Sequence, residues 1–214
     1  MNLMEVRSTK IAKEDYLMVF KILSDFYGEV QLTMLARELG VTSATAHKVI
    51  RHLEEQGLVR RLGRGAYLLT ENGDEIASKM LSKHRILEVF LSILGFNMLE
   101  SHTYAHELEH VSDVVIDKIY NMLGKPAVCP HGNPILGKPQ GIPLSRAYPG
   151  RVIVVSIAEL KAVLTYLMDN KIGLNSEVTV VRRRRGDVVV EVNGKVSLID
   201  SDIASGIYVM EARR

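Results

Sequence analysis

The chain has 214 residues, 47% of them hydrophobic and 24% charged, with a formal net charge of +2, which excludes a disordered protein and allows one large or two to three small domains. It contains no run of 18 apolar residues and no apolar leader at its N-terminus, so we expect a cytoplasmic protein with no membrane partner. A single cysteine, Cys129, excludes an internal disulfide and a cysteine-rich zinc ribbon, so any metal site must rest on histidines and carboxylates.

The N-terminal stretch predicts a helix-turn-helix. Apolar residues at helical intervals predict a first helix between Glu14 and Tyr27, ended by Gly28. The stretch LTMLARELG predicts a second short helix ended by Gly40, and Thr42 or Ser43 can cap a third helix running through VTSATAHKVIRHLEEQGLV. Two helices joined by a tight turn are typical of this DNA-binding motif.

The stretch GLVRRLGRGAYLLTENG then predicts a two-stranded wing with a basic tip. A helix and a wing of this kind supply the two parts of duplex binding, base reading and phosphate contact. We predict that base edges are read by Thr42, Ser43, Thr45, His47 and Lys48, and that phosphates are held by Arg60, Arg61 and Arg64. A winged helix that serves as a protein-interaction module is the alternative.

The middle of the chain is acidic and rich in histidine. Residues 71–123 carry 4 basic and 9 acidic residues and four of the seven histidines. We predict a long helix from Glu71 to Leu94 and a second helix from near Glu100 to Gly124. The apolar side of the second helix, a candidate dimer surface, holds Leu108, Val111, Val115, Ile119 and Met122.

Within that second helix, HTYAHELEHV spaces histidines four residues apart. On a continuous helix, positions 102, 106, 109 and 110 face one direction, but a rise of about 1.5 Å per residue separates the first and last by roughly 12 Å. One ion cannot use all four positions, because ligand bonds are near 2 Å. We therefore expect one ion to be shared by His106, Glu109 and His110, and a second site to combine His102 with His84 and Glu88, if the two helices pack side by side.

Three other interpretations of these histidines stay open. The letters HELEH fit a zinc hydrolase in which His106 and His110 are ligands and Glu107 is the base. They also fit the inverted pattern, with Glu109 as the base. The side chains could, finally, be solvated or bonded only to one another.

The C-terminal third begins with KPAVCPHGNPILGKPQGIPLSRAYPG, which holds all six prolines and predicts a long connection rather than packed structure. Cys129 and His131 in it are interpreted as loop structure, with an auxiliary metal contact as the alternative. The stretch SIAELKAVLTYLMDNKIG predicts a helix. Alternation in SEVTVVRRRRGDVVVEVNGKVSLID, with turns at Arg185-Gly186 and Asn193-Gly194, predicts strands of a small β-barrel. The arginine run at 182–185 is either a nucleic-acid contact or a solvated hairpin end.

The order of the winged helix, KHRILEVFLSILGF, SHTYAHELEHVSD and CPHGNPILG resembles the diphtheria toxin repressor family of iron- and manganese-dependent repressors. The resemblance covers nearly the whole chain. It implies a mainly α fold with a small β part, in three domains: a winged helix-turn-helix in 1–71, a helical metal-binding and dimerisation domain in 72–140, and an SH3-like β-barrel in 141–214.

Carried over by position, the resemblance implies a regulatory metal site made of Asp15, His106, Glu109 and His110, and a second site made of His84, Glu88 and His102. In the manganese-sensing branch, the residue matching His84 belongs to the main cluster. Iron-sensing members have methionine at the position of Asp15 and cysteine at that of His106, and the manganese-sensing branch has glutamate at the latter. Iron-sensing members add a Glu and a Gln from the barrel, where this chain has Glu159 one place away and Val163.

The resemblance implies a non-enzymatic repressor that binds operator DNA as a homodimer when loaded with Fe²⁺ or Mn²⁺, and that takes no small-molecule substrate. Ni²⁺, Co²⁺ or Zn²⁺ should substitute in vitro. The alternatives are a zinc metallohydrolase that uses HELEH and a metal-independent winged-helix regulator of small-molecule response.

Overall fold

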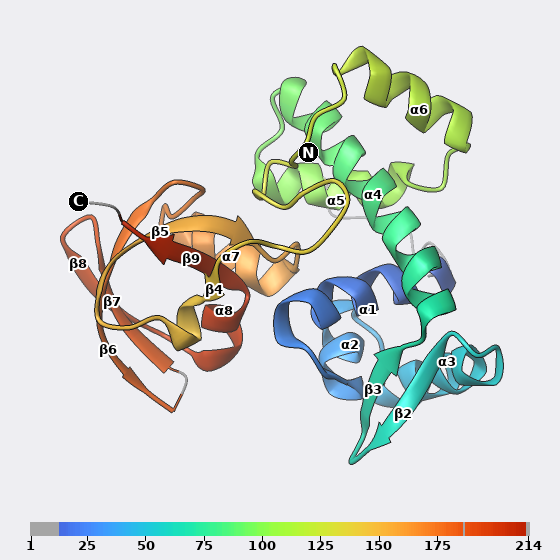
Figure 1. Cartoon of the computed structure of the whole chain (residues 1–214), viewed down its shortest axis with the longest axis horizontal. Coiled ribbons are helices and arrows are strands. Elements are labelled where there is room, and N and C mark those ends of the chain that lie inside the picture. Colours follow the sequence, from blue (N-terminus) through green and yellow to red (C-terminus); the bar gives the residue numbers. More distant parts are fainter. Residues whose placement is uncertain (1–12, 186, 213–214) are drawn as a thin grey trace, which may run out of the picture.

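The structure is a computed structural model that describes residues 13–185 and 187–212. The chain forms three lobes: a winged helix, a helical lobe joined to it by the long helix α4, and a β-sheet domain at the C-terminal end (Figure 1). None of the helices in this part of the chain has the length and apolar character that crossing a membrane requires.

The predicted helix-turn-helix and wing are confirmed. The lobe consists of α1 (Lys13–Tyr27), β1 (Val30–Gln31), α2 (Leu32–Glu38), α3 (Ser43–Glu55), β2 (Val59–Gly63) and β3 (Ala66–Leu69). Thr42 caps α3, because its hydroxyl accepts a hydrogen bond from the Thr45 amide at 3.1 Å. Helix α3 buries Ala46, Ile50 and Leu53, which leaves its polar side in solvent. The strands pair in the order β1-β3-β2.

The helical lobe contains α4 (Glu71–Ile93), α5 (Met98–Leu108) and α6 (Asp113–Met122). The prediction of one helix from Glu100 to Gly124 is wrong, because the chain leaves the helix after Leu108 and begins α6 after the N-cap residue Ser112. The apolar spacing continues across this short turn, so periodicity alone did not reveal it. Of the residues on the predicted apolar side, Val115 and Met122 are 46% and 67% exposed in the single chain, whereas the neighbouring Ile116 is buried.

The C-terminal domain is an antiparallel sheet of the SH3-like type with strand order β4-β9-β5-β6-β7-β8. Its elements are β4 (Ile142–Pro143), the 3-10 helix η1 (Leu144–Arg146), β5 (Gly150–Ile157), α7 (Lys161–Asp169), β6 (Glu177–Arg184), β7 (Asp187–Val192), β8 (Lys195–Ile199), α8 (Ser201–Ser205) and β9 (Ile207–Glu211). The predicted turn at Asn193-Gly194 is confirmed, with φ of 52° and 74°. Ser156 and Ile157, predicted as the start of a helix, end a strand instead, because β5 alternates buried residues into the core.

The proline-rich stretch is packed rather than a loose connection, which corrects the prediction. Cys129, His131, Asn133 and Ile135 are all buried. Hydrogen bonds to β5 take the place of regular structure: the Asn133 amide donates to the Ile157 carbonyl at 2.7 Å, and the Ile157 N–H donates to the His131 carbonyl at 3.0 Å. Proline and glycine content therefore identified irregular backbone correctly but gave no information about burial.

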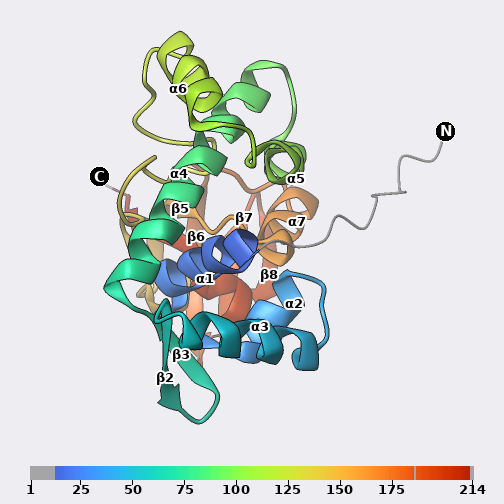
Figure 2. The same cartoon turned by 90° about the vertical axis from the view of Figure 1, so that its right-hand side faces the viewer.

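The C-terminal domain packs on the winged helix through one continuous apolar core, while α4, α5 and α6 share a second, smaller one. Hydrogen bonds reinforce the packing of the C-terminal domain on the winged helix. The Tyr27 hydroxyl donates to the Asp202 carbonyl at 2.9 Å, and the Lys161 N–H donates to Glu38 Oε1 at 2.7 Å. Figure 2 shows α1 between the helical lobe above and α2 and α3 below. Helix α1 contacts α2, α3 and α4, and its C-terminal end contacts the C-terminal domain.

Candidate metal centre

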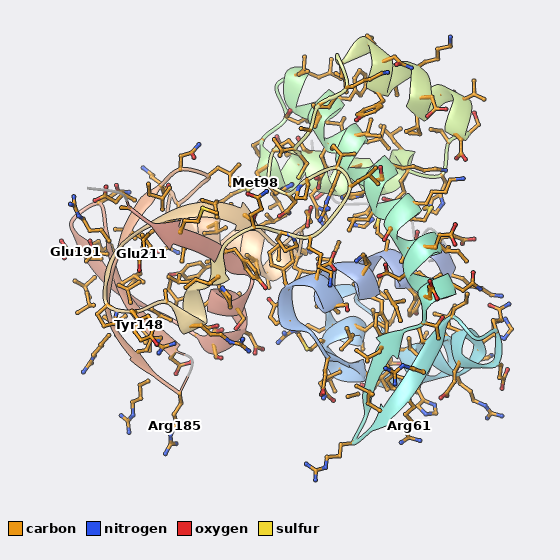
Figure 3. All side chains as sticks on the ribbon, viewed as in Figure 1. Arg61, Met98, Tyr148, Arg185, Glu191 and Glu211 are labelled. Atoms are coloured by element: carbon orange, nitrogen blue, oxygen red, sulfur yellow. The ribbon has the colours of Figure 1, made fainter. Side chains whose placement is uncertain are left out.

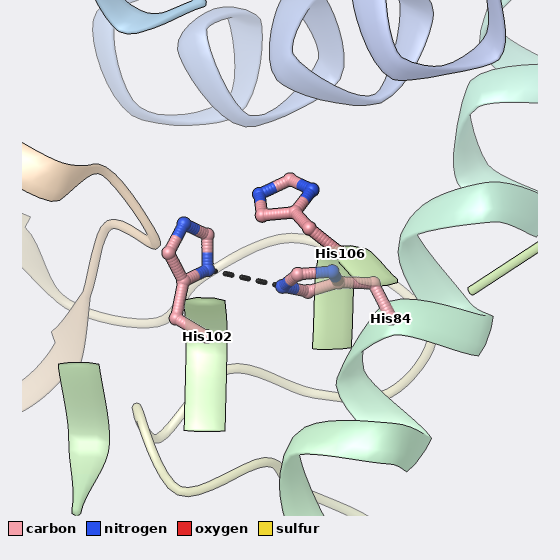
Figure 4. Close-up of side chains that lie close together, drawn as sticks. All are labelled: His84, His102 and His106. Atoms are coloured by element: carbon pink, nitrogen blue, oxygen red, sulfur yellow. Dashed lines mark hydrogen bonds between the residues drawn. The ribbon is translucent and has the colours of Figure 1, made fainter. Parts of the chain in front are cut away.

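Helices α4 and α5 pack side by side and bring three imidazoles together (Figure 4). His84 Nε2 on α4 lies 3.0 Å from His102 Nδ1 on α5. The ring of His106, one turn further along α5, lies 4.6 Å from that of His84, measured between centroids. His84 and His102 are buried and His106 is partly exposed, so the cluster extends from the interior of the lobe toward its surface.

Glu109, at the C-terminal end of α5, joins this cluster to α1. Its Oε2 lies 2.6 Å from His84 Nδ1, and its Oε1 lies 3.3 Å from His106 Nδ1. Glu109 also shares a potential ligand group with Asp15 and His110, and His110 Nε2 lies 2.9 Å from Asp15 Oδ1. The turn after α5 makes this possible, because it frees His110 from the helix and directs it toward α1.

Glu88 is the centre of a second cluster. It is fully buried and contacts three imidazoles, because its Oε1 lies 3.0 Å from His84 Nε2 and 3.2 Å from His102 Nδ1, while its Oε2 lies 3.0 Å from His131 Nδ1. Cys129 and Glu159 complete a buried group with Glu88 and His131. Cys129 Sγ lies 3.8 Å from His131 Nδ1 and 3.7 Å from Glu159 Oε1.

Glu159 is held by Arg85, whose Nε donates to Glu159 Oε1 at 2.7 Å. Arg85 also donates to the Pro134 carbonyl at 2.7 Å, so one buried guanidinium fixes both the carboxylate and the proline-rich loop. Orientation of a potential ligand by such a neighbour is typical of metal sites in proteins.

The buried charges shift several pKa values. Burial by itself lowers the pKa of His84, but the carboxylates of Glu88 and Glu109 on its two nitrogens raise it to about 10. Burial lowers the pKa of His102 to about 3. The pKa of Glu109 falls to about 2 against the effect of burial, because His106 and His84 donate hydrogen bonds to its carboxylate. The ionised carboxylates attract a cation, and His84, which carries a proton on each ring nitrogen in this arrangement, must release one before it can bind a metal ion.

The residues present fit such a cation. In each of three groups, the donor atoms lie within 4.8 Å of one another, as ligands do around one ion with bonds of about 2.0–2.2 Å. The groups are His84 with His102 and His106, then Asp15 with Glu109 and His110, and finally Glu88 with Cys129, His131 and Glu159. Imidazole, carboxylate and one thiol suit divalent transition metals such as Fe²⁺ and Mn²⁺.

The structure brings together all seven residues predicted as ligands. The predicted second set is in mutual contact, because the polar atoms of His84, Glu88 and His102 lie 3.0–3.2 Å apart. The groups also extend beyond the predicted sets, since His106 lies with His84 and His102 rather than with His110, and Glu88 lies with Cys129, His131 and Glu159. Only the letters CPH signalled the loop residues, and nothing in the spacing connected them to Glu88, which lies 43 positions away in the sequence from His131.

The residues predicted to contact DNA lie on one lobe and are all exposed: Thr42, Ser43, Thr45, His47 and Lys48 on α3 or at its start, and Arg60, Arg61 and Arg64 on the wing. The Thr42 hydroxyl caps the helix and lies 2.9 Å from the Thr45 hydroxyl, so both are already engaged within the chain. Arg61 lies on β2 opposite Tyr67 (Figure 3), and Arg64 lies in the turn at the tip of the wing.

Comparison with known proteins finds matches in all three lobes of the described fold. Residues 70–137 match the family described as iron dependent repressor, metal binding and dimerisation domain, residues 142–211 match the FeoA domain, and residues 16–63 match the IclR helix-turn-helix domain. The diphtheria toxin repressor of Corynebacterium diphtheriae is 31% identical over 198 residues, which cover 83% of this chain and 87% of that protein.

Solved structures agree with the sequence comparison. The crystal structure of IdeR from T. acidophilum superposes with a TM-score of 0.81 and 27% identity, covering 95% of this chain and 100% of that one. A manganese-dependent transcriptional repressor in complex with manganese superposes with a TM-score of 0.76 and 33% identity, covering 94% of this chain and 100% of that one.

Proposed function

The chain belongs to the diphtheria toxin repressor family of metal-dependent transcriptional repressors, and we propose that it binds operator DNA as a homodimer when Fe²⁺ or Mn²⁺ occupies its metal centre. The observation that supports the proposal is the contact of His110 with Asp15, because it joins a potential ligand of the DNA-binding lobe to potential ligands at the edge of the helical lobe. Such a regulator acts where the chromosome is, so we expect it in the cytoplasm.

We assign the regulatory site to Asp15, His106, Glu109 and His110, with His84 as a shared member. His84 lies between the regulatory site and the cluster around Glu88, since one of its ring nitrogens faces Glu109 and the other faces Glu88. A bound divalent cation supplies positive charge that offsets the carboxylates. Without it, the negative charges of Asp15 and Glu109 repel each other and favour release of α1, which shifts the population of winged-helix positions.

We assign a second site to Glu88, Cys129, His131 and Glu159, with His102 at its edge. The position of Glu159 supports a role for this site in coupling the C-terminal domain to the helical lobe. Glu159 follows β5 and so comes from the C-terminal domain, whereas Glu88 comes from α4. The thiol of Cys129 has a raised pKa owing to burial and must lose its proton to become a ligand. An ion at this site therefore links the C-terminal domain to the helical lobe.

The proposed dimer uses the helical lobe. Several large apolar side chains there are exposed in the single chain, and they are Ile93, Leu94, Val114, Val115 and Met122. Exposed large apolar side chains gathered on one lobe are typical of a protein interface, and a second copy is favoured because the matched family is described as a dimerisation domain. We also propose three domains, at 1–71, 72–140 and 141–214, because the matched regions 16–63, 70–137 and 142–211 follow nearly the same limits.

The hydrolase alternative has no support in the comparisons, whose members are transcriptional regulators. Its geometry is also unfavourable, because the HELEH letters do not lie on one helix and His106 and His110 fall in different ligand groups. We therefore propose no catalytic role for Glu107.

The experiment that tests the proposal is fluorescence anisotropy of chelator-treated protein on labelled duplexes from its own promoter, titrated anaerobically with Fe²⁺ and separately with Mn²⁺. Metal-dependent tightening by roughly 5- to 150-fold is the expected coupling between two such sites. Binding that is equally tight with and without metal would reduce the centre to a structural role. No binding under any condition would refute the function.

A further inference from the structure

The hairpin formed by β6 and β7 carries four consecutive arginines, residues 182–185, and all four are exposed. Alternation along a strand would direct two of them toward the core. That does not occur here, because the register shifts between Val180 and Arg182 and the buried side of the strand ends at Val180. Arg185 adopts φ of 55° in the turn itself. The run therefore forms a basic tip beyond the end of the barrel core.

One of these arginines holds the tip in place. Arg183 donates to the Ser145 carbonyl at 3.2 Å, and its guanidinium lies 5.6 Å from the ring centroid of Tyr148. Arg182, Arg184 and Arg185 form no ion pair within the part of the chain that the structure describes. The hairpin thus presents three unpaired guanidinium groups on an anchored strand end.

The carboxylates near this end have other partners. Asp187, opposite Arg184 in the register, accepts from the Ser201 N–H at 2.9 Å. Asp200 caps α8 by accepting from the Ile203 N–H at 3.0 Å. Because these acids serve the hairpin base and α8, the positive charge at the tip remains available to an external anion.

The same end of the domain contacts the winged helix. Asp202 on α8 forms an ion pair with Arg37 of α2 at 3.2 Å and accepts from the Tyr27 hydroxyl of α1 through its carbonyl. In Figure 3, Arg185 and the wing residue Arg61 both project from the lower edge of the molecule, whereas Glu191 lies at the other end of the sheet. The barrel hairpin and the wing are therefore two arginine-tipped hairpins directed to one side.

We propose that the β6–β7 hairpin is an additional duplex-binding element, in which Arg182, Arg184 and Arg185 contact phosphates of DNA flanking the segment read by α3. The proposal rests on the proposed function, since it assumes that the winged helix binds a duplex. Guanidinium groups bind phosphate oxygens with paired hydrogen bonds, and a contact of this kind adds affinity without sequence preference. The C-terminal domain then contributes directly to DNA affinity.

The test compares two triple variants of the full chain, each lacking three positive charges. One is Arg182→Gln with Arg184→Gln and Arg185→Gln, which leaves the anchor Arg183 intact. The matched control removes three exposed lysines elsewhere in the C-terminal third, by Lys138→Gln, Lys171→Gln and Lys195→Gln. Both are measured with saturating Mn²⁺ on a promoter duplex and on a shuffled 60-base-pair duplex over a range of salt concentrations, with circular dichroism to verify folding.

We expect the arginine variant alone to lose affinity on both duplexes and to reduce the slope of log K against log salt by about 0.9 for each lost phosphate contact. The ratio of affinities with and without metal should stay that of the wild type. An unchanged slope in a wild-type protein that does bind DNA overturns the inference and leaves the proposed function intact. A weakened dimer in sedimentation, with an unchanged slope, would instead assign the hairpin to a protein contact and also overturn it.

Discussion

His110 Nε2 lies 2.9 Å from a carboxylate oxygen of Asp15, so the turn after α5 is joined to the first turns of α1. Asp15 lies on the helix that carries much of the core of the winged helix, and His110 lies beside the buried histidine cluster. A change at the metal centre can therefore alter the position of the DNA-binding lobe through one pair of side chains.

Replacing Asp15 with alanine should abolish the metal stimulation of DNA binding while leaving the fold intact, because a donor from α1 is lost. The coupling removed corresponds to roughly 5- to 150-fold in affinity. Anisotropy with and without Mn²⁺ measures it, and Glu14→Ala, an exposed acid in the same turn, is the control. A full metal response in the Asp15 variant would exclude this residue from the regulatory site.

Replacing His131 with glutamine should reduce the number of bound metal ions per chain by one, because the second cluster loses its imidazole. Metal content after dialysis against limiting free Mn²⁺ or Fe²⁺ gives the stoichiometry. His52→Gln, on the exposed side of α3, should keep the wild-type value. An unaltered stoichiometry in the His131 variant would mean that the buried group around Glu88 is held together by hydrogen bonds alone.

Replacing Lys48 with alanine should weaken metal-loaded DNA binding by roughly 5- to 10-fold, because an exposed cation on α3 loses its phosphate or base contact. The same assay on Lys138→Ala, an exposed lysine of the proline-rich loop, should show no change. Equal affinities for the Lys48 variant and the wild type would argue that α3 is not the helix placed in the major groove.

Replacing Met122 with glutamate should weaken the dimer, since this side chain is 67% exposed in the single chain and an interface would have to desolvate the new charge. Sedimentation velocity over a concentration series measures the shift toward monomer. Lys171→Glu, which changes an exposed residue of the C-terminal domain, controls for the added negative charge. Dimers of undiminished stability would show that the apolar side of α6 is not the interface.

The contact of Glu38 with α7 should depend on pH. Burial raises the pKa of Glu38, although the Lys161 N–H that donates to it at 2.7 Å acts in the opposite direction. Because its folded pKa is above its unfolded value, Glu38 favours folding below the unfolded value, and this contribution is lost as pH rises through the folded pKa.

Glu38→Gln keeps an oxygen acceptor for Lys161 and removes the charge. The free energy of unfolding of the variant should therefore increase relative to that of the wild type as pH rises from about 4 to 7.5. Urea unfolding at several pH values measures the difference. Glu29→Gln, at an exposed acid between α1 and β1, should run parallel to the wild type. Parallel curves for Glu38→Gln as well would show that the carboxylate is not buried against α7 in solution.

The sequence by itself determined the local structure and the chemical type of the centre. The caps and glycines around α1, α2 and α3, the arginines of the wing and the Asn193-Gly194 turn each depend on a few adjacent residues, and all were predicted correctly. The histidine spacing also indicated His84, Glu88, His102 and His106, which α4 and α5 bring close together. Short-range steric and hydrogen-bonding rules are sufficient for such features.

Only the tertiary structure decided which donors share a group. The turn after Leu108 separates His106 from His110, and the packed proline-rich loop brings His131 to Glu88 across 43 positions. Burial of that loop depends on Arg85 and on hydrogen bonds to β5, none of which has a periodic signature in the sequence. Contacts between distant segments arise from packing of the whole chain, so the composition of the centre became visible only when α1, α4, α5 and the C-terminal domain were placed together.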